Sequence, residues 1–366
     1  MTGAPAGATA HLAAIGRSPR AAGSAEERAA RDYCASVLRA TGFGVAIEPF
    51  EYSRLPGRFG TPVGGVLALL AIVGTVWAGT SRGSPELAAA TFVAGVAVLA
   101  LWARRMLGEA VLDLPWLRAA GENLVATREE RIPRLWLVAH LDTKSQPVPS
   151  AGRVAGVVLL VGALGITAVA LGLALAGAAP RTLWWIGAAL AIVGAVPVMA
   201  STVGNESPGA VDNASGVAAV LVAAESLARD ANVGVLLSSA EEMGLAGARA
   251  WARARGAERG IALNCDGVDD EGALTIMYSG TLPDDVIRTL AEGVERAPRV
   301  RRMPVGMLLD SVAFAESGWR SVTVSRGSLA TLRRVHTRDD SLTRLRGDGI
   351  PEVARVLARA AEALAR

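Results

Sequence analysis

Four long runs of residues without any charge interrupt the chain, and they come in two pairs. They are the segment between Arg58 and Arg82, Leu87 to Ala103, Val154 to Ala179, and Thr182 to Val203. Each run is close to the roughly 20 apolar residues that a helix needs to cross a bilayer. The pattern predicts two transmembrane helical hairpins. Pairs of buried helices in a soluble protein are the alternative, but the lack of charge, and Trp102 with Arg104 and Arg105 at the end of one run, favour lipid.

Outside these runs, short apolar segments alternate with amphipathic ones, as in an α/β protein. Val233 to Leu237 is apolar throughout, which suits a strand in a sheet covered on both faces. We therefore expect a mixed, mostly parallel sheet sandwiched by helices and interrupted by the two hairpins. The expected strands are Val45 to Tyr52, 122–129, 134–140, Val233 to Leu237, the run ending at 263–267, 272–280 and 321–325; the expected helices are Ser24 to Leu38, Gly209 to Ala228, Asp284 to Glu295 and Pro351 to Leu364.

The same pattern divides the chain into domains. Residues 1–60, 107–153 and 204–366 form the globular part, with the HLD strand in its middle piece. Residues 61–106 form the first hairpin and residues 154–203 the second. Four spans return the chain to the side on which it started, so the three globular pieces can share one compartment.

Several of the predicted strands and helices end in side chains that bind metals or move protons. These side chains are His140 and Asp142 in HLD, Asp212 near a helix start, the adjacent Glu241 and Glu242, Asp266, and His336 with Asp339 and Asp340 nearby. Asp212 alone could be a helix-capping residue, because acids suit a helix N-terminus. As a set, two histidines and several carboxylates at strand ends suit a pair of hydrolytic zinc ions, since imidazole and carboxylate both bind zinc.

The order HLD, AVDNASGVAAVL, SSAEEMGLAGARAW, LNCDG and VHTRDD resembles the co-catalytic di-zinc aminopeptidases of metallopeptidase family M28. The N-terminal RSPRAAGSAEERAARDYCASVLRATGFGVAIEPFEY also resembles the opening helix and first strand of that family. The resemblance covers most of the chain outside the hairpins, and its motifs are specific as a set but weak singly. One departure is the segment Val154 to Val203, which stands where the relatives have a short loop.

The resemblance implies a set of five metal ligands. Asp212 would bridge two zinc ions, His140 and Asp266 would complete one site, and Glu242 and His336 would complete the other. No ligand that the family would use is missing, which argues against an inactive relative.

The resemblance also implies roles for residues around the metals. Glu241 would be the general base, and Asp142 would accept a hydrogen bond from the His140 ring. The peptide bond between Asp212 and Asn213 would be cis. Asp310, in an Asp-Ser pair before a helix, would belong to the substrate pocket, with a helix N-cap as the equal alternative.

Composition narrows the choice of partners. Hydrophobic residues make up 51% of the chain, which suggests that part of it lies in lipid. A net charge of +3 and 4% aromatic residues argue against nucleic acid as a partner. Cys34 and Cys265 lie in apolar surroundings and are expected to be reduced core thiols. His11 lies outside every motif and is expected at the surface.

Charge also predicts the orientation in the membrane. Residues 1–22 lack the apolar segment of a signal peptide. More basic residues flank the globular side of the hairpins than their tips, which favours a cytoplasmic globular part in a four-span cell-membrane protein. The flanking residues are Arg54, Arg58, Arg104, Arg105, Lys144 and Arg153, and the tip residues are Arg82 and Arg181.

The sequence thus predicts a membrane-anchored zinc exopeptidase that removes N-terminal residues from peptides with two zinc ions. Another zinc amidohydrolase, of carboxypeptidase or glutaminyl cyclase type, is one alternative, and a membrane scaffold without turnover is another. Because the second hairpin interrupts the loop between His140 and Asp212, we expect a cleft near the membrane surface that takes membrane-proximal or lipophilic peptides. No motif specifies an oligomeric state.

Overall fold

The chain forms two compact units in the computed structural model, which describes residues 7–366 except 129–131, 257, 295 and 305. The sheet unit comprises residues 1–53, 112–145 and 205–366. The helical unit comprises residues 54–111 and 146–204. Three stretches that are far apart in the sequence therefore build one α/β unit.

The sheet unit is organised around an eight-stranded mixed sheet in the order β1-β2-β4-β3-β5-β8-β6-β7. At its centre β4, β3, β5 and β8 pair in parallel, whereas β1 with β2, β2 with β4, and β6 with β8 are antiparallel. The strands are β1 (Gly44–Ser53), β2 (Arg118–Thr127), β3 (Leu135–His140), β4 (Val233–Ser238), β5 (Ile261–Val268), β6 (Ala273–Tyr278), β7 (Arg299–Arg302) and β8 (Arg320–Gly327). The mixed, mostly parallel sheet expected from the sequence is confirmed.

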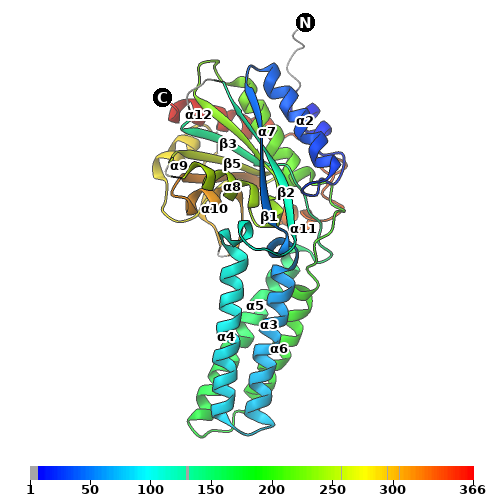
Figure 1. The fold of residues 1–366 in the computed structure, drawn as a ribbon, viewed down its shortest axis with the longest axis vertical. Coiled ribbons are helices and arrows are strands. Elements are labelled where there is room, and N and C mark those ends of the chain that lie inside the picture. Colours follow the sequence, from blue (N-terminus) through cyan, green and yellow to red (C-terminus); the bar gives the residue numbers. More distant parts are fainter. Residues whose placement is uncertain (1–6, 129–131, 257, 295, 305) are drawn as a thin grey trace. The chain divides into compact units, whose positions relative to one another are not determined.

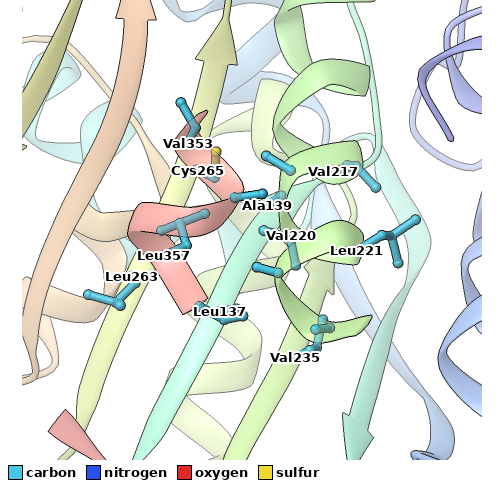
Figure 2. Close-up of a cluster of buried hydrophobic side chains, with 14 of the residues drawn as sticks. Leu137, Ala139, Val217, Val220, Leu221, Val235, Leu263, Cys265, Val353 and Leu357 are labelled. Carbon is cyan, nitrogen blue, oxygen red and sulfur yellow. The ribbon is translucent and has the colours of Figure 1, made fainter. Parts of the chain in front are cut away.

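Helices cover both faces of this sheet because side chains alternate along each strand. On β3, Leu137 and Ala139 belong to the core beneath α7 and α12, which Figure 2 shows in close-up. Trp136 and Val138 belong to a second core on the other face, with Trp251 of α8 among their neighbours. The elements of the unit besides its strands are α1 (Ala8–Ile15), α2 (Ala25–Ala40), α7 (Gly216–Ser226), α8 (Ala246–Arg255), α9 (Asp284–Ala291), α10 (Asp310–Glu316), α11 (Leu329–Arg334) and α12 (Ile350–Leu364), with shorter helical turns at Ala210–Ser215 and Glu241–Met243. A further short turn, Glu109–Leu112, lies at the boundary between the two units.

The N-terminal helices differ from the sequence prediction in one respect. Ser24 caps α2 as expected, its hydroxyl accepting the N–H of Glu27. The prediction that His11 is a surface residue is wrong, because its side chain is fully buried in α1. Its Nδ1 lies 2.8 Å from the Tyr33 hydroxyl and its Nε2 3.2 Å from Glu225 Oε1. The small residues around His11 gave no helical signal, yet α1 packs on α7 and takes the histidine into the core. Helix α9 is shorter than predicted, and Glu295 lies outside the described residues.

The helical unit consists of four helices formed by the four uncharged runs (Figure 1). They are α3 (Leu55–Thr80), α4 (Pro85–Leu107), α5 (Ser150–Leu175) and α6 (Arg181–Met199). Small residues allow close helix packing: a Cβ added at Gly156 would lie 2.7 Å from the Gly194 oxygen, and one at Gly95 2.5 Å from the Ala71 Cβ. Such contacts are typical of helices that associate within a bilayer.

These four helices are long and apolar enough to cross a membrane. Large apolar side chains lie exposed on them, for example Val93 at 66%, Val158 at 64% and Trp185 at 65%. A soluble helical unit would bury such side chains, whereas lipid accommodates them at no cost. The exposed surface of the helical unit is therefore compatible with a bilayer.

Candidate metal centre

Each oxygen of the Asp212 carboxylate faces a different histidine. Oδ1 lies 3.1 Å from Nε2 of His140, and Oδ2 lies 2.9 Å from Nε2 of His336. His140 is the last residue of β3, and Asp212 lies in the irregular turn Ala210–Ser215 before α7. The Asp212 backbone is not helical and its side chain points at the histidines, so it does not cap α7. A carboxylate placed in this way can be shared by two cations.

Two clusters of potential metal ligands surround this carboxylate. One contains His140, Glu241 and Asp266, and the other contains Asp212, Glu242 and His336. Within each cluster the ligand atoms lie within 4.8 Å of one another. The structure therefore brings together all five side chains of the expected ligand set, with Glu241 beside them.

Glu241 and Glu242 follow β4 in a tight turn that Asp142 holds. The peptide N–H of Glu241 donates to Asp142 Oδ1 at 3.0 Å, and that of Glu242 donates to Oδ2 at 3.1 Å. Ala240, just before the turn, has a φ of 57°. The fully buried Asp142 carboxylate thus fixes the backbone on which both glutamates stand.

The contact of Asp142 with His140 differs from the prediction. His140 Nδ1 lies 3.0 Å from the backbone oxygen of Asp142 and 3.7 Å from its carboxylate. The carboxylate is occupied by the two peptide N–H groups, so the main-chain oxygen takes the ring contact. The histidine is still oriented by Asp142, but through the backbone.

Asn213 links Asp212 to the segment that carries Asp266. The peptide bond between Asp212 and Asn213 is cis, as the resemblance implies. The Asn213 side chain donates to the Cys265 oxygen at 2.9 Å and accepts the N–H groups of Gly216 and Gly267. One amide side chain therefore connects the turn before α7 to the end of β5.

The donor atoms fit divalent metal ions. Glu242 Oε1 and Asp266 Oδ2 are buried, and neither has a hydrogen-bond partner within the described part of the chain. Leaving charged oxygens buried without partners is costly. Two imidazoles and three carboxylates are also the ligand types that zinc prefers.

Comparisons with known proteins also indicate a metallopeptidase. Residues 195–361 match the model of Peptidase family M28. This part of the chain, a little under half of it, is therefore similar to the peptidases of family M28. No curated protein matches it by sequence.

Solved structures of similar fold include aminopeptidases and a cyclase. An aminopeptidase from Aneurinibacillus sp. strain AM-1 is similar over 98% of this chain and 93% of that chain, with a TM-score of 0.57 and 14% identity. A zinc aminopeptidase from Bacillus subtilis is similar over 96% of this chain and 93% of that chain, with a TM-score of 0.55 and 14% identity. A glutaminyl cyclase from Bacteroides thetaiotaomicron is similar over 96% of this chain and 95% of that chain, with a TM-score of 0.53 and 14% identity. At this identity the likeness shows a shared fold.

Burial and neighbouring charges shift the pKa values of the acidic side chains in this candidate metal centre. Burial raises the pKa of Glu241 well above its usual range, and the carboxylates of Glu242 and Asp266 add to the shift although His140 opposes it. Burial alone would also raise the pKa of Asp212, but hydrogen bonds from His140 and His336 outweigh it and hold that pKa well below its usual range. The two acids thus have different tendencies: Asp212 stays ionised, whereas Glu241 holds a proton more readily.

Asp310, the predicted pocket residue, is fully buried at the start of α10. It makes no capping hydrogen bond, so the N-cap alternative is wrong. Its Oδ2 accepts a hydrogen bond from the Ser238 hydroxyl at the end of β4. Burial raises the Asp310 pKa to about 7, despite opposition from His140 and Ser238.

Three supporting residues are not among the site residues predicted from the sequence. The Arg20 guanidinium is buried and donates to the main-chain oxygens of Leu141 and Gly209, which lie on either side of the site. The Asp340 carboxylate accepts the N–H groups of Val211 and Asp212. Lys144 forms an ion pair with Glu242. Asp340 could have been found from the paired acids after His336, but Arg20 stands among many arginines and has no local signal.

Proposed function

We propose that this protein is a membrane-anchored aminopeptidase of family M28 that uses two zinc ions to hydrolyse N-terminal residues from peptides. The observation that carries the proposal is the Asp212 carboxylate, which offers one oxygen to the side of His140 and the other to the side of His336. His140 and Asp266 would hold one zinc with Asp212, and Glu242 and His336 would hold the other. A shared carboxylate of this kind suits a pair of metal ions.

Zinc, when bound, polarises the scissile carbonyl and lowers the pKa of water towards about 7. The protein itself moves the protons. Glu241 is nearly buried, and its backbone is fixed by Asp142. Because its pKa is raised, Glu241 can take a proton from the attacking water and return it to the leaving amine at neutral pH.

The four apolar helices support membrane anchoring. The hairpin ends that join the sheet unit carry more basic residues than the hairpin tips do. This difference supports a cytoplasmic catalytic unit. Under this proposal, peptides would reach the site from the cytoplasm.

A glutaminyl cyclase activity is the second candidate, supported by the cyclase among the structures of similar fold. The complete set of two histidines and three carboxylates favours two metals and hydrolysis. The two candidates differ in their product, because a cyclase closes the N-terminal glutaminyl residue into a ring without consuming water.

The test uses the full chain purified in detergent, with wild type compared with Glu241→Gln. We expect close to two zinc per chain in both proteins, and hydrolysis of aminoacyl amides only by wild type. Glu26→Gln, at an exposed position of α2, is the matched control and should be fully active. Glutaminyl peptides assayed for ring closure and N-acetylated peptides assayed for cleavage separate the alternatives. Zinc binding without hydrolysis of any free N-terminal substrate would overturn the aminopeptidase proposal.

A further inference from the structure

Lys144 is the only lysine in the chain, and every other residue of the Lys and Arg type is arginine. On a protein surface, lysine and arginine replace each other at little cost, but at a site that needs one compact charge they do not. A chain whose basic residues are otherwise all arginine retains an ammonium at this one position. The position lies four residues after His140, at the metal centre.

The Lys144 ammonium contacts one oxygen of Glu242. The ion pair is formed with Oε2, and the Glu242 side chain is 3% exposed while that of Lys144 is 17% exposed. The other oxygen, Oε1, lies 3.3 Å from His336 Nε2. Oε1 is buried and accepts no hydrogen bond from any residue that the structure describes. The two oxygens of Glu242 therefore have different surroundings, one facing Lys144 and the other facing the metal ligands.

We propose that Lys144 is a positioning residue that makes Glu242 a one-oxygen ligand, so that the site of Asp212, Glu242 and His336 binds its metal more weakly than the site containing His140 and Asp266. The inference rests on the proposed two-zinc function. By holding Oε2, Lys144 prevents Glu242 from chelating through both oxygens. Its positive charge also repels a cation bound nearby.

The same geometry explains why the residue is lysine. An arginine fork tends to bind both oxygens of a carboxylate at once. At this position it would cover Oε1 as well as Oε2 and compete with the metal for Glu242. An ammonium is a single point of charge, so it leaves Oε1 available.

The two substitutions at Lys144 should therefore act in opposite directions. Lys144→Met frees Oε2 and removes a positive charge that repels the metal, so the weaker zinc should bind roughly 10-fold more tightly. Lys144→Arg should weaken the same zinc by roughly 10-fold or more, because the guanidinium occupies both oxygens. The affinity for the first zinc should change little in either variant.

The experiment is a titration of the metal-free, full-length protein in detergent with Zn²⁺ in competition with a chromophoric chelator. Co²⁺ gives a spectroscopic readout: chelation by both oxygens in Lys144→Met raises the coordination number at the second site and should weaken its visible absorption. Arg253→Met, which removes the charge of an exposed ion pair with Asp113, is the control and should match wild type. Thermal melting and the first-zinc affinity report whether each variant is folded.

Ligand variants identify the weaker site without changing Lys144. Glu242→Gln should leave the first zinc unaffected and abolish the second, whereas Asp266→Asn should weaken the first. One outcome would overturn the inference alone: the wild-type chain binds two zinc ions, and the affinity for the second zinc in both Lys144 variants equals that of wild type or shifts in the same direction. A wild-type chain that binds a single zinc at every concentration would overturn the two-zinc function as well.

Discussion

The carboxylate of Asp142 accepts the peptide N–H of Glu241, with 3.0 Å between Glu241 N and Asp142 Oδ1. Its second oxygen accepts the N–H of Glu242 in the same way. One buried side chain at the end of β3 thus sets the position of the proposed general base and of a proposed metal ligand that follow β4. The geometry of the proposed active site therefore depends on a contact between the segments that follow two strands.

Replacing Asp142 by Asn tests this dependence. An amide presents one oxygen and one NH₂ group, so one of the two peptide N–H groups loses its acceptor. We expect zinc affinity or hydrolysis to fall by roughly 10- to 100-fold, as for other residues that orient metal ligands. Competition titration with Zn²⁺ and steady-state hydrolysis measure the two effects. Asp113→Asn, at an exposed ion pair, is the control, and unchanged values in Asp142→Asn would show that the turn is held by other contacts.

Position 209 must be glycine because neighbouring atoms of Asp212 and Thr143 leave no room for a Cβ atom. Its φ is 57°, and a Cβ there would lie 2.2 Å from the Asp212 oxygen and 2.3 Å from Thr143 Cγ2. Gly256 has a similar φ of 53°, but a Cβ there meets no described atom within 4 Å. Gly209→Ala should therefore lower both zinc affinity and melting temperature, whereas Gly256→Ala should lower only the melting temperature, through the backbone strain of a positive φ. Equal effects of the two substitutions would contradict the crowding argument.

Glu27 makes stability depend on pH. Burial, reinforced by the Asp142 charge, raises the pKa of Glu27 from 4.5 to about 7. The folded chain therefore binds more protons than the unfolded chain between these values, so stability falls as pH rises through that window. At pH 8 the ionised carboxylate costs at most roughly 3 kcal/mol.

The corresponding substitution is Glu27→Gln, which cannot ionise. We expect it to raise the apparent melting temperature in detergent at pH 8 and to have little effect near pH 4. Its exposed neighbour provides the control: Glu26→Gln should leave the pH profile unchanged. A Glu27→Gln profile parallel to that of wild type would contradict the raised pKa.

The two cysteines should be unreactive in the folded protein. Cys34 and Cys265 are both 0% exposed and unpaired with each other. Burial also raises the pKa of the Cys34 thiol to about 12, so little thiolate forms at neutral pH. A maleimide should label neither residue in native protein and both after unfolding in denaturant, as measured by mass spectrometry. Rapid native labelling would show that one of the cores opens.

Because the two native cysteines should not react with maleimide, cysteines introduced at exposed positions can be used to test the membrane orientation. Ser81 lies at the tip between α3 and α4 and Arg359 on α12, and both are exposed. If the sheet unit is cytoplasmic, an impermeant maleimide added to intact cells should label Ser81→Cys and not Arg359→Cys. Permeabilised cells should show labelling of both. The reverse pattern in intact cells would place the catalytic unit outside.

Local patterns in the sequence were sufficient for the four apolar helices, for most of the strands and for the types of ligand, but not for α1 or β7. The uncharged runs became α3 to α6, because hydrophobicity over about 20 residues is a property of the segment itself. Strand ends at His140 and Asp266 could be located in the same way, since alternation and apolar runs are local. The parallel centre of the sheet then brings strand ends to one edge.

Tertiary structure decided which partner each buried polar group found. Asp142 faces the peptide N–H groups of Glu241 and Glu242 rather than the His140 ring, Lys144 meets Glu242, and His11 is buried against Tyr33 and Glu225. Arg20 likewise satisfies carbonyl groups that lie more than a hundred residues away. Hydrophobic periodicity specifies which face of an element is buried. It does not specify which donor meets which acceptor, because buried polar groups must be satisfied by whatever the folded chain brings within about 3 Å.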